Sequence, residues 1–142
     1  MDTLLEKLNE RQKEAVLTTQ GPLLVVAGAG SGKTLVLTHR IAYLILEKGV
    51  HPSRILAVTF TNKAASEMKE RIAHILRERR SSSATDLLHM GTFHSVCLGI
   101  LRAHAEVLGL TPHFVIFDEK DQLALIKTVC EELEVDTELF AP

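Results

Sequence analysis

The 142-residue sequence is long enough for one ordinary domain, and its 46% hydrophobic content excludes a disordered chain. It holds no apolar run near the roughly 20 residues needed to cross a bilayer and no secretory signal pattern, so we expect a cytoplasmic protein without a membrane partner. The formal net charge of −2 argues against a uniformly basic nucleic-acid binder, although residues 54–80 carry +4 and residues 118–142 carry −6. Any phosphate-backbone partner should therefore meet the middle of the chain.

The first predicted helix runs to about residue 18. Asn9 is a favourable N-cap, and Gln12, three residues later, can close a capping box. An apolar strand is predicted at residues 23–27, followed by an amphipathic helix at residues 33–47. The predicted core face of that helix consists of Leu37, Ile41, Leu44 and Ile45. Together these segments form a first βα unit.

The glycine-rich stretch Ala-Gly-Ala-Gly-Ser-Gly-Lys-Thr occupies residues 27–34, between that strand and helix. Its glycines allow backbone conformations that turn consecutive N–H groups toward one cavity. Lys33 and the N-terminus of the following helix add positive potential there. This arrangement is typical of a loop that binds nucleotide phosphates, although the strict pattern has glycine where this chain has Ala27. We therefore predict a nucleoside triphosphate site.

Two further βα units are predicted after the first. The strand at residues 55–59 is apolar throughout, as expected for a parallel strand covered on both faces. A third short strand is predicted near residues 87–91. The helix after the second strand has a predicted core face of Met68, Ile72, Ile75 and Leu76. The helix after the third has a predicted core face of Val96, Cys97, Ile100, Leu101 and Leu108.

The C-terminal part is predicted as a short strand or extended segment at residues 114–117 and an acidic helix at residues 119–133. The predicted inward face of this helix consists of Leu123, Ile126, Cys130 and Leu133. Cys97 and Cys130 lack the spacing of a zinc site, so we interpret both as reduced core residues.

Alternating strands and helices predict an α/β fold with a parallel sheet, in which ligands bind at the carboxyl ends of the strands. Three polar stretches fall at that end: residues 27–34, 60–63 and 92–95. We therefore expect them to converge on one rim. Taken alone, Phe60 also fits an ordinary core residue and Thr92 a helix N-cap, and His94 fits a surface histidine.

With these stretches assembled, the chain resembles the N-terminal part of the UvrD/Rep/PcrA group of superfamily 1 DNA helicases. Residues 8–12 are similar to the family's Q motif and residues 27–34 to its motif I, in which alanine is common at the first position. Residues 57–65 and 91–95 are similar to motifs Ia and Ib. The resemblance implies a P-loop NTPase (RecA-like) partial parallel sheet flanked by helices over residues 1–112. Residues 113–142 would then begin an accessory helical subdomain.

The resemblance implies ATP and Mg²⁺ as cofactors. Lys33 would bind the β- and γ-phosphates and Thr34 would ligate Mg²⁺, which makes these two the catalytic candidates. The phosphate cradle would consist of Ala29, Gly30, Ser31, Gly32, Lys33 and Thr34. Gln12 would read the adenine edge, while the alternative is that it only caps its helix. Leu35 departs from the family, which usually has an arginine against the base at that position.

The resemblance also implies single-stranded DNA as a partner. Phe60 would stack on a base, and the backbone contacts would come from Thr61, Asn62, Lys63, Thr92, His94 and Ser95. The remaining histidines have no ligand spacing.

A helicase of this family also needs a Walker B Asp-Glu pair and arginine fingers from a second RecA-like domain. Asp118-Glu119 is the one adjacent Asp-Glu pair, and the resemblance places it at the entry to the helical subdomain instead. We therefore expect the ATP- and single-stranded-DNA-binding N-terminal segment of a longer 3′–5′ DNA helicase, unable by itself to hydrolyse ATP and with an exposed sheet edge. The alternatives are a non-catalytic nucleotide- or DNA-binding module, including a natural truncated product, and another P-loop enzyme, whose acceptor-site lid we do not find.

Overall fold

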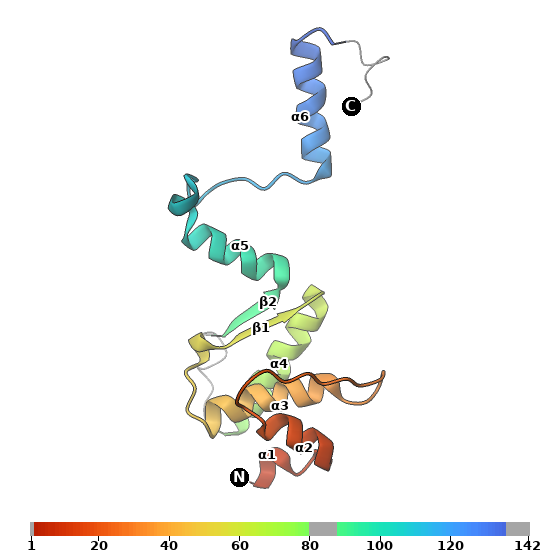
Figure 1. The fold of residues 1–142 in the computed structure, drawn as a ribbon, viewed down its shortest axis with the longest axis vertical. Helices are drawn as coiled ribbons and strands as arrows, with labels where there is room; N and C mark the ends of the chain where they lie inside the picture. Colours follow the sequence, from red (N-terminus) through yellow and green to blue (C-terminus); the bar gives the residue numbers. More distant parts are fainter. Residues whose placement is uncertain (1, 80–87, 136–142) are drawn as a thin grey trace. The chain divides into compact units, whose positions relative to one another are not determined.

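The described part of the chain, residues 2–79 and 88–135 of a computed structural model, consists of helices and two short strands (Figure 1). The chain divides into two compact units, Met1–Ile100 and Leu101–Pro142, which are described separately. The predicted boundary between a RecA-like part and a helical subdomain, at residues 112 and 113, stays a prediction. None of the helices in the described ranges is long and apolar enough to span a membrane.

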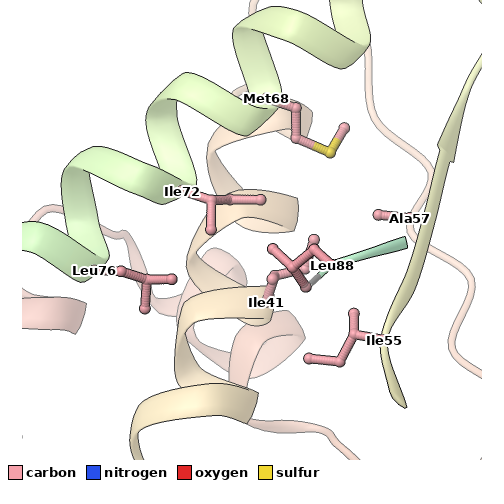
Figure 2. Close-up of a cluster of buried hydrophobic side chains, with 7 residues drawn as sticks. All are labelled: Ile41, Ile55, Ala57, Met68, Ile72, Leu76 and Leu88. Atoms are coloured by element: carbon pink, nitrogen blue, oxygen red, sulfur yellow. The ribbon is translucent and has the colours of Figure 1, made fainter. Parts of the chain in front are cut away.

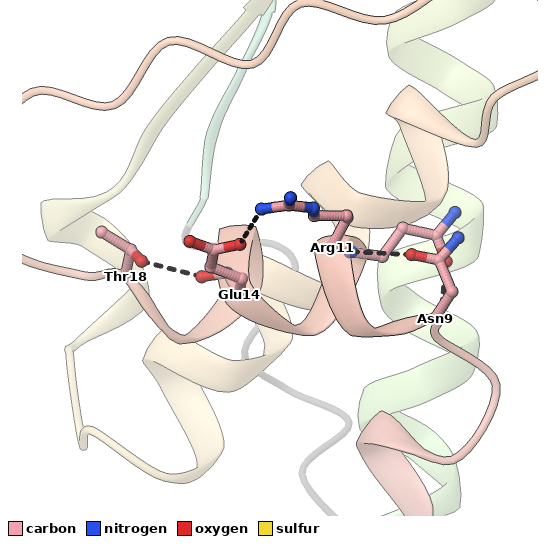
Figure 3. A network of polar contacts seen from close by, with 5 residues as sticks. Asn9, Arg11, Glu14 and Thr18 are labelled. Carbon is pink, nitrogen blue, oxygen red and sulfur yellow. Dashed lines mark hydrogen bonds and ion pairs between the residues drawn. The ribbon is translucent and has the colours of Figure 1, made fainter.

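The first unit begins with α1 (Asp2–Leu5) and α2 (Glu10–Leu17). The predicted capping box of α2 is confirmed: the Asn9 side chain accepts from the Gln12 N–H at 2.9 Å, and the Gln12 side chain accepts from the Asn9 N–H at 3.0 Å. At the other end, the Thr18 hydroxyl donates to the Glu14 carbonyl at 2.8 Å (Figure 3). The exposed ion pair between Arg11 and Glu14 adds little to stability.

Helix α3 (Lys33–Leu46) packs against α2 on one side and against α4 (Asn62–Glu78) on another. For this reason it buries more than the single face predicted from its periodicity. Ile41 is buried as predicted, whereas Leu37 is 37% exposed and Tyr43, which was not predicted, is buried. One hydrophobic cluster joins α1, α2 and α3 through Leu4, Leu8, Ala15, Val16, Val36, Ala42 and Tyr43.

A second cluster joins α3 and α4 to the sheet and consists of Ile41, Ile55, Ala57, Met68, Ile72, Leu76 and Leu88 (Figure 2). Ile72 and Leu76 are completely buried, and burying a side chain of this size contributes about 1.5–3 kcal/mol. The predicted face of α4 is confirmed at Met68, Ile72 and Leu76. Ile75 packs instead against the first cluster, because it lies on the side of α4 next to the α1 and α3 residues.

The sheet consists of β1 (Leu56–Thr59) and β2 (His89–Thr92), which pair in parallel with Thr59 opposite Thr92. The ends of both strands lie within two residues of the predicted bounds. Leu87, where the third strand was predicted to begin, lies outside the described residues. The expectation that β1 is covered on both faces is wrong. Ala57 faces the core, whereas Leu56, on the other face, is 57% exposed.

The strand predicted at residues 23–27 is absent from the sheet. A strand needs hydrogen-bonding partners, and this segment has none among the described strands. Its exposure still alternates as in an extended segment: Leu24 and Val26 are 86% and 87% exposed, whereas Leu23 and Val25 are 41% and 44% exposed. The two better-covered side chains line a cavity of about 330 Å³ together with α3. The prediction of a buried strand at these residues is therefore wrong: the segment is unpaired, and one of its sides is exposed.

The chain continues with α5 (Phe93–Ala103), η3 (Ala105–Leu108) and α6 (Glu119–Glu132). Both long helices were predicted, but their predicted burial is wrong: α5 and α6 contain no buried residue. Ile100, Leu101, Leu108, Leu123, Ile126 and Leu133 are 39% to 69% exposed. Cys97 is exposed and Cys130 half-buried, so neither is the core cysteine expected. Residues 114–117 form no strand.

Candidate nucleotide and nucleic-acid sites

The phosphate-loop candidate turns directly into α3, as its sequence predicts. Gly30 and Gly32 have φ values of 74° and 85°, in the left-handed region that glycine adopts without strain. Gly32 is the N-cap of α3 and provides no side-chain cap, so the first N–H groups of the helix lack a side-chain acceptor. These groups and the positive end of the helix dipole suit an anion.

The two catalytic candidates lie at the start of this helix. Lys33 is exposed, and its ammonium donates to the carbonyls of Ala27 at 2.8 Å and of Gly28 at 2.6 Å. The Ser31 hydroxyl donates to the same Gly28 carbonyl at 2.7 Å. Thr34 is exposed beside the lysine. The loop therefore holds its own positive charge in place through backbone carbonyls.

Gln12 connects the Q-motif helix to this loop. Its Oε1 accepts from the Asn9 N–H, and its Nε2 donates to the Ser31 carbonyl at 3.1 Å. A Cβ at Gly32 would lie 2.8 Å from this Nε2, so a larger residue there would displace the amide. The structure confirms that Gln12 caps its helix, but it does more than cap, because it also contacts the loop. Recognition of adenine by Gln12 stays a prediction. One N–H and one oxygen lone pair of its amide are not used in these two hydrogen bonds and are available for the base.

Arg40 connects α3 to the C-terminal end of α2. We predicted no role for it from the sequence. Its Nη1 donates to the Ala15 carbonyl at 2.6 Å and also to the Thr18 carbonyl, at the C-terminal end of α2. A cation is favourable at this end of a helix. Gln12 and Arg40 therefore tie α2 to the loop and to α3 at two separate points.

Leu35, the departure from the family pattern, points into the protein. Its side chain packs against the cluster of α1, α2 and α3, and its carbonyl accepts from Thr38 Oγ1 at 2.9 Å and lies 2.9 Å from His39 Nδ1. It also lines a largely apolar cavity of about 420 Å³ between α1, α3 and α4, which contains none of the predicted site residues. Leu35 therefore contributes to core packing at the position where the resemblance implies an arginine.

The nucleic-acid candidates lie where β1 and β2 end. Phe60 and Phe93 directly follow the register pair Thr59 and Thr92, and their ring centroids are 5.6 Å apart with an interplanar angle of 45°. Phe60 is 92% exposed, so its interpretation as a core residue is wrong. Phe93 is 47% exposed and was not predicted as a site residue. The signal that could have identified it is its place after a predicted strand: Phe60 directly follows the strand predicted at residues 55–59, and Phe93 comes two residues after the strand predicted near residues 87–91.

Two helices start beside these rings. The Thr61 side chain caps α4 by accepting from the Ala64 N–H at 3.2 Å, and Asn62 and Lys63 are exposed in the first turn. At the start of α5, the Thr92 hydroxyl accepts from the Ser95 N–H at 3.3 Å, which confirms its interpretation as an N-cap.

Ser95 and Gly91 fit closely at this turn. The Ser95 hydroxyl donates to the Thr92 carbonyl at 2.9 Å, and a Cβ at Gly91 would lie only 2.4 Å from that hydroxyl oxygen. His94 is exposed, in agreement with its surface interpretation. The structure thus joins residues 60–63 to residues 92–95 at one edge of the sheet. The expected convergence with the phosphate loop stays a prediction, because the segment before the loop is not part of the sheet.

The fold is a mixed helix–strand unit with a glycine-rich loop before α3 and a small parallel sheet. Residues 8–142 match the UvrD/REP helicase N-terminal domain family. The chain therefore belongs to the UvrD/REP helicase family, which confirms the resemblance. It is 51% identical over its full length to the ATP-dependent DNA helicase PcrA of Staphylococcus epidermidis and 50% identical to PcrA of Staphylococcus aureus. The chain spans 19% of the length of these relatives.

Proposed function

We propose that this chain is the N-terminal ATP- and single-stranded-DNA-binding part of an ATP-dependent 3′–5′ DNA helicase with a RecA-like first domain. Family membership supports the proposal, and so does the similarity to PcrA proteins, which are ATP-dependent DNA helicases. The structural observation behind the proposal is the start of α3. Gly32, the N-cap of this helix, has a left-handed conformation and provides no side-chain cap, and Lys33 is the first residue of the helix.

The residues of the loop fit a triphosphate. Its N–H groups and the Lys33 ammonium are donors without an acidic side chain among them, as an anion requires. In the proposal, Lys33 leaves the two loop carbonyls and binds the β- and γ-phosphates, while the N–H groups from Gly30 to Thr34 cradle them. Ala29 provides close backbone approach at the start of the cradle. Gln12 holds the loop through Ser31 and contacts adenine with its remaining amide donor.

The fit to Mg²⁺ is partial. Thr34 supplies one exposed hydroxyl, and the described residues contain no cluster of three or more His, Cys, Asp or Glu that could hold a metal ion. Bound Mg²⁺ would neutralise charge on the phosphates in the complete helicase. Asp118 caps α6, since its side chain accepts from the N–H groups of Lys120 and Asp121. In agreement with the family resemblance, we propose that it is not the Walker B carboxylate. We therefore propose that these 142 residues bind ATP without hydrolysing it.

The DNA part of the proposal rests on the edge formed by β1, β2 and the starts of α4 and α5. Phe60 would stack on a base, and the Thr61 hydroxyl, which only accepts in its cap, would donate to a phosphate. Lys63 would add a charge contact. The remaining backbone contacts are assigned to Asn62, Thr92, His94 and Ser95.

Titration with a fluorescent ATP analogue tests the nucleotide site. We expect saturable binding that Lys33→Ala weakens by tenfold or more, because hydrogen bonds to a charged group contribute about 1.5–3 kcal/mol. Lys120→Ala is the matched control, since this lysine lies in the first turn of α6, and it should leave binding unchanged. Equal binding by the wild type and Lys33→Ala would contradict the site, and phosphate release that Lys33→Ala abolishes would contradict the absence of hydrolysis.

A further inference from the structure

We infer that Phe93 is a positioning residue for single-stranded DNA, because it holds the Phe60 ring in the orientation that stacks on a base. The inference rests on the proposed DNA-binding function. It gives a role to Phe93, for which neither the sequence motifs nor the family match implied one. The Phe60 and Phe93 rings contact each other, and both are exposed to solvent.

The arrangement follows from the sheet register. Thr59 and Thr92 are partners in neighbouring parallel strands, so the residues that follow them leave the sheet side by side. The chain then enters α4 after Thr61 and α5 at Phe93 itself. Both helix starts are capped by threonine side chains, which fixes the backbone that carries each ring. Each ring is thus attached to backbone that is fixed by a neighbouring strand and a capped helix start.

The contact is asymmetric. Phe93 is half-covered, whereas Phe60 is 92% exposed, so little besides Phe93 restricts the Phe60 ring. Their centroid separation of 5.6 Å lies within the range in which aromatic pairs attract each other, and the 45° tilt leaves a face of Phe60 open. Leaving so large an apolar ring in water forgoes the stabilisation that burial would give. Preorganisation of a base-stacking surface accounts for the exposure, because an ordered ring loses less entropy when a base binds.

A double-mutant cycle read through a stacked fluorescent base tests this role. The probes are an oligothymidylate carrying one 2-aminopurine, whose fluorescence is quenched by stacking, and the same strand with an abasic site in its place. Phe60→Leu should weaken binding of the first probe by about 5- to 100-fold and remove the quenching. Phe93→Leu should weaken it by about 3- to 10-fold and reduce the quenching, with the affinity for the abasic strand unchanged.

Two further variants make the cycle decisive. Phe93→Tyr keeps the ring and should restore both affinity and quenching. In a Phe60→Leu background, Phe93→Leu should have no further effect, because it acts through Phe60. Normal quenching by Phe93→Leu, or independent multiplicative losses in the double variant, would overturn the inference. Unchanged thermal unfolding midpoints check that the exposed substitutions leave the fold intact.

The same experiment distinguishes a failure of the Phe93 role from a failure of the proposed DNA binding. Failure of the wild-type chain to bind either strand would refute the proposed DNA binding, and the role of Phe93 with it, before any variant is made. Wild-type binding with base-dependent quenching that is insensitive to Phe93→Leu would refute the role of Phe93 alone.

Discussion

The segment from α1 to β2 and the helices α5 and α6 have sequences of similar amphipathic quality, yet only the former buries its apolar faces. Helices α3 and α4 contribute to two clusters that include completely buried side chains such as Ile72 and Leu76. Helices α5 and α6 contain no buried residue. Helical periodicity therefore specifies which face of a helix is apolar, whereas burial of that face requires a packing partner. The binding candidates lie on or beside the part that has its own core.

We expect the two regions to differ most in how much the free energy of unfolding falls when an apolar side chain is truncated. Ile72→Ala removes a completely buried side chain between α3, α4 and the sheet and should lower the free energy of unfolding by about 2–5 kcal/mol. The matched variant Ile126→Ala, at a 47% exposed position of α6, should change it by less than about 0.5 kcal/mol. Urea titration followed by circular dichroism measures both. Equal losses would mean that α6 is packed as tightly as α4.

Arg40→Ala should have the next largest effect, because it leaves two carbonyls at the end of α2 without their charged donor. We expect a loss of about 1.5–3 kcal/mol in the free energy of unfolding, together with weaker binding of the ATP analogue. Arg11→Ala is the control, because Arg11 forms only an exposed ion pair on the same helix. A normal affinity for ATP in a folded Arg40→Ala chain would show that the tie between α2 and α3 does not position the loop.

Two similar capping boxes allow a direct comparison of the regions. Asn9→Ala removes the cap of α2, whose Val16 is completely buried, and should lower the free energy of global unfolding by about 1 kcal/mol. Asp118→Ala removes the cap of α6, a 14-residue helix without a buried face. Such a helix is marginal alone, so the loss should appear as local fraying. Amide hydrogen exchange in α6 should therefore accelerate while the global unfolding midpoint stays constant; a shifted midpoint would show that α6 is coupled to the core.

The smallest expected effect comes from two glycines of the β2–α5 region. A Cβ at Gly91 would lie 2.4 Å from Ser95 Oγ and displace the hydroxyl that donates to the Thr92 carbonyl, whereas a Cβ at Gly99, in the middle of α5, meets nothing within 4 Å. Gly91→Ala should cost about 1 kcal/mol through the loss of this hydrogen bond, and Gly99→Ala should favour the helix by about 0.5–1 kcal/mol. Helical signal in circular dichroism during thermal unfolding should move in opposite directions for the two variants. Movement in the same direction would contradict the close fit at Gly91.

The features that local sequence could predict are those that depend on neighbours in the chain. The Asn9–Gln12 capping box spans three residues, and the buried face of α4 follows from helical spacing. The strand expected before the phosphate loop needed a hydrogen-bonding partner that its own residues do not specify. The contact of Phe60 with Phe93 depends on the register of two strands separated by α4. Arg40 could not be assigned because its partners lie more than 20 residues earlier.

We propose that the loop before α3 cradles nucleotide phosphates with its backbone N–H groups. Hydrogen exchange of the full chain with and without ATP and Mg²⁺ tests this most directly, because the start of α3 lacks a side-chain cap in this structure. We predict that ATP slows exchange of the N–H groups from Gly30 to Thr34, that Lys33→Ala abolishes this protection, and that α6 is unaffected. Saturable ATP binding without protection of these five residues would contradict the claim.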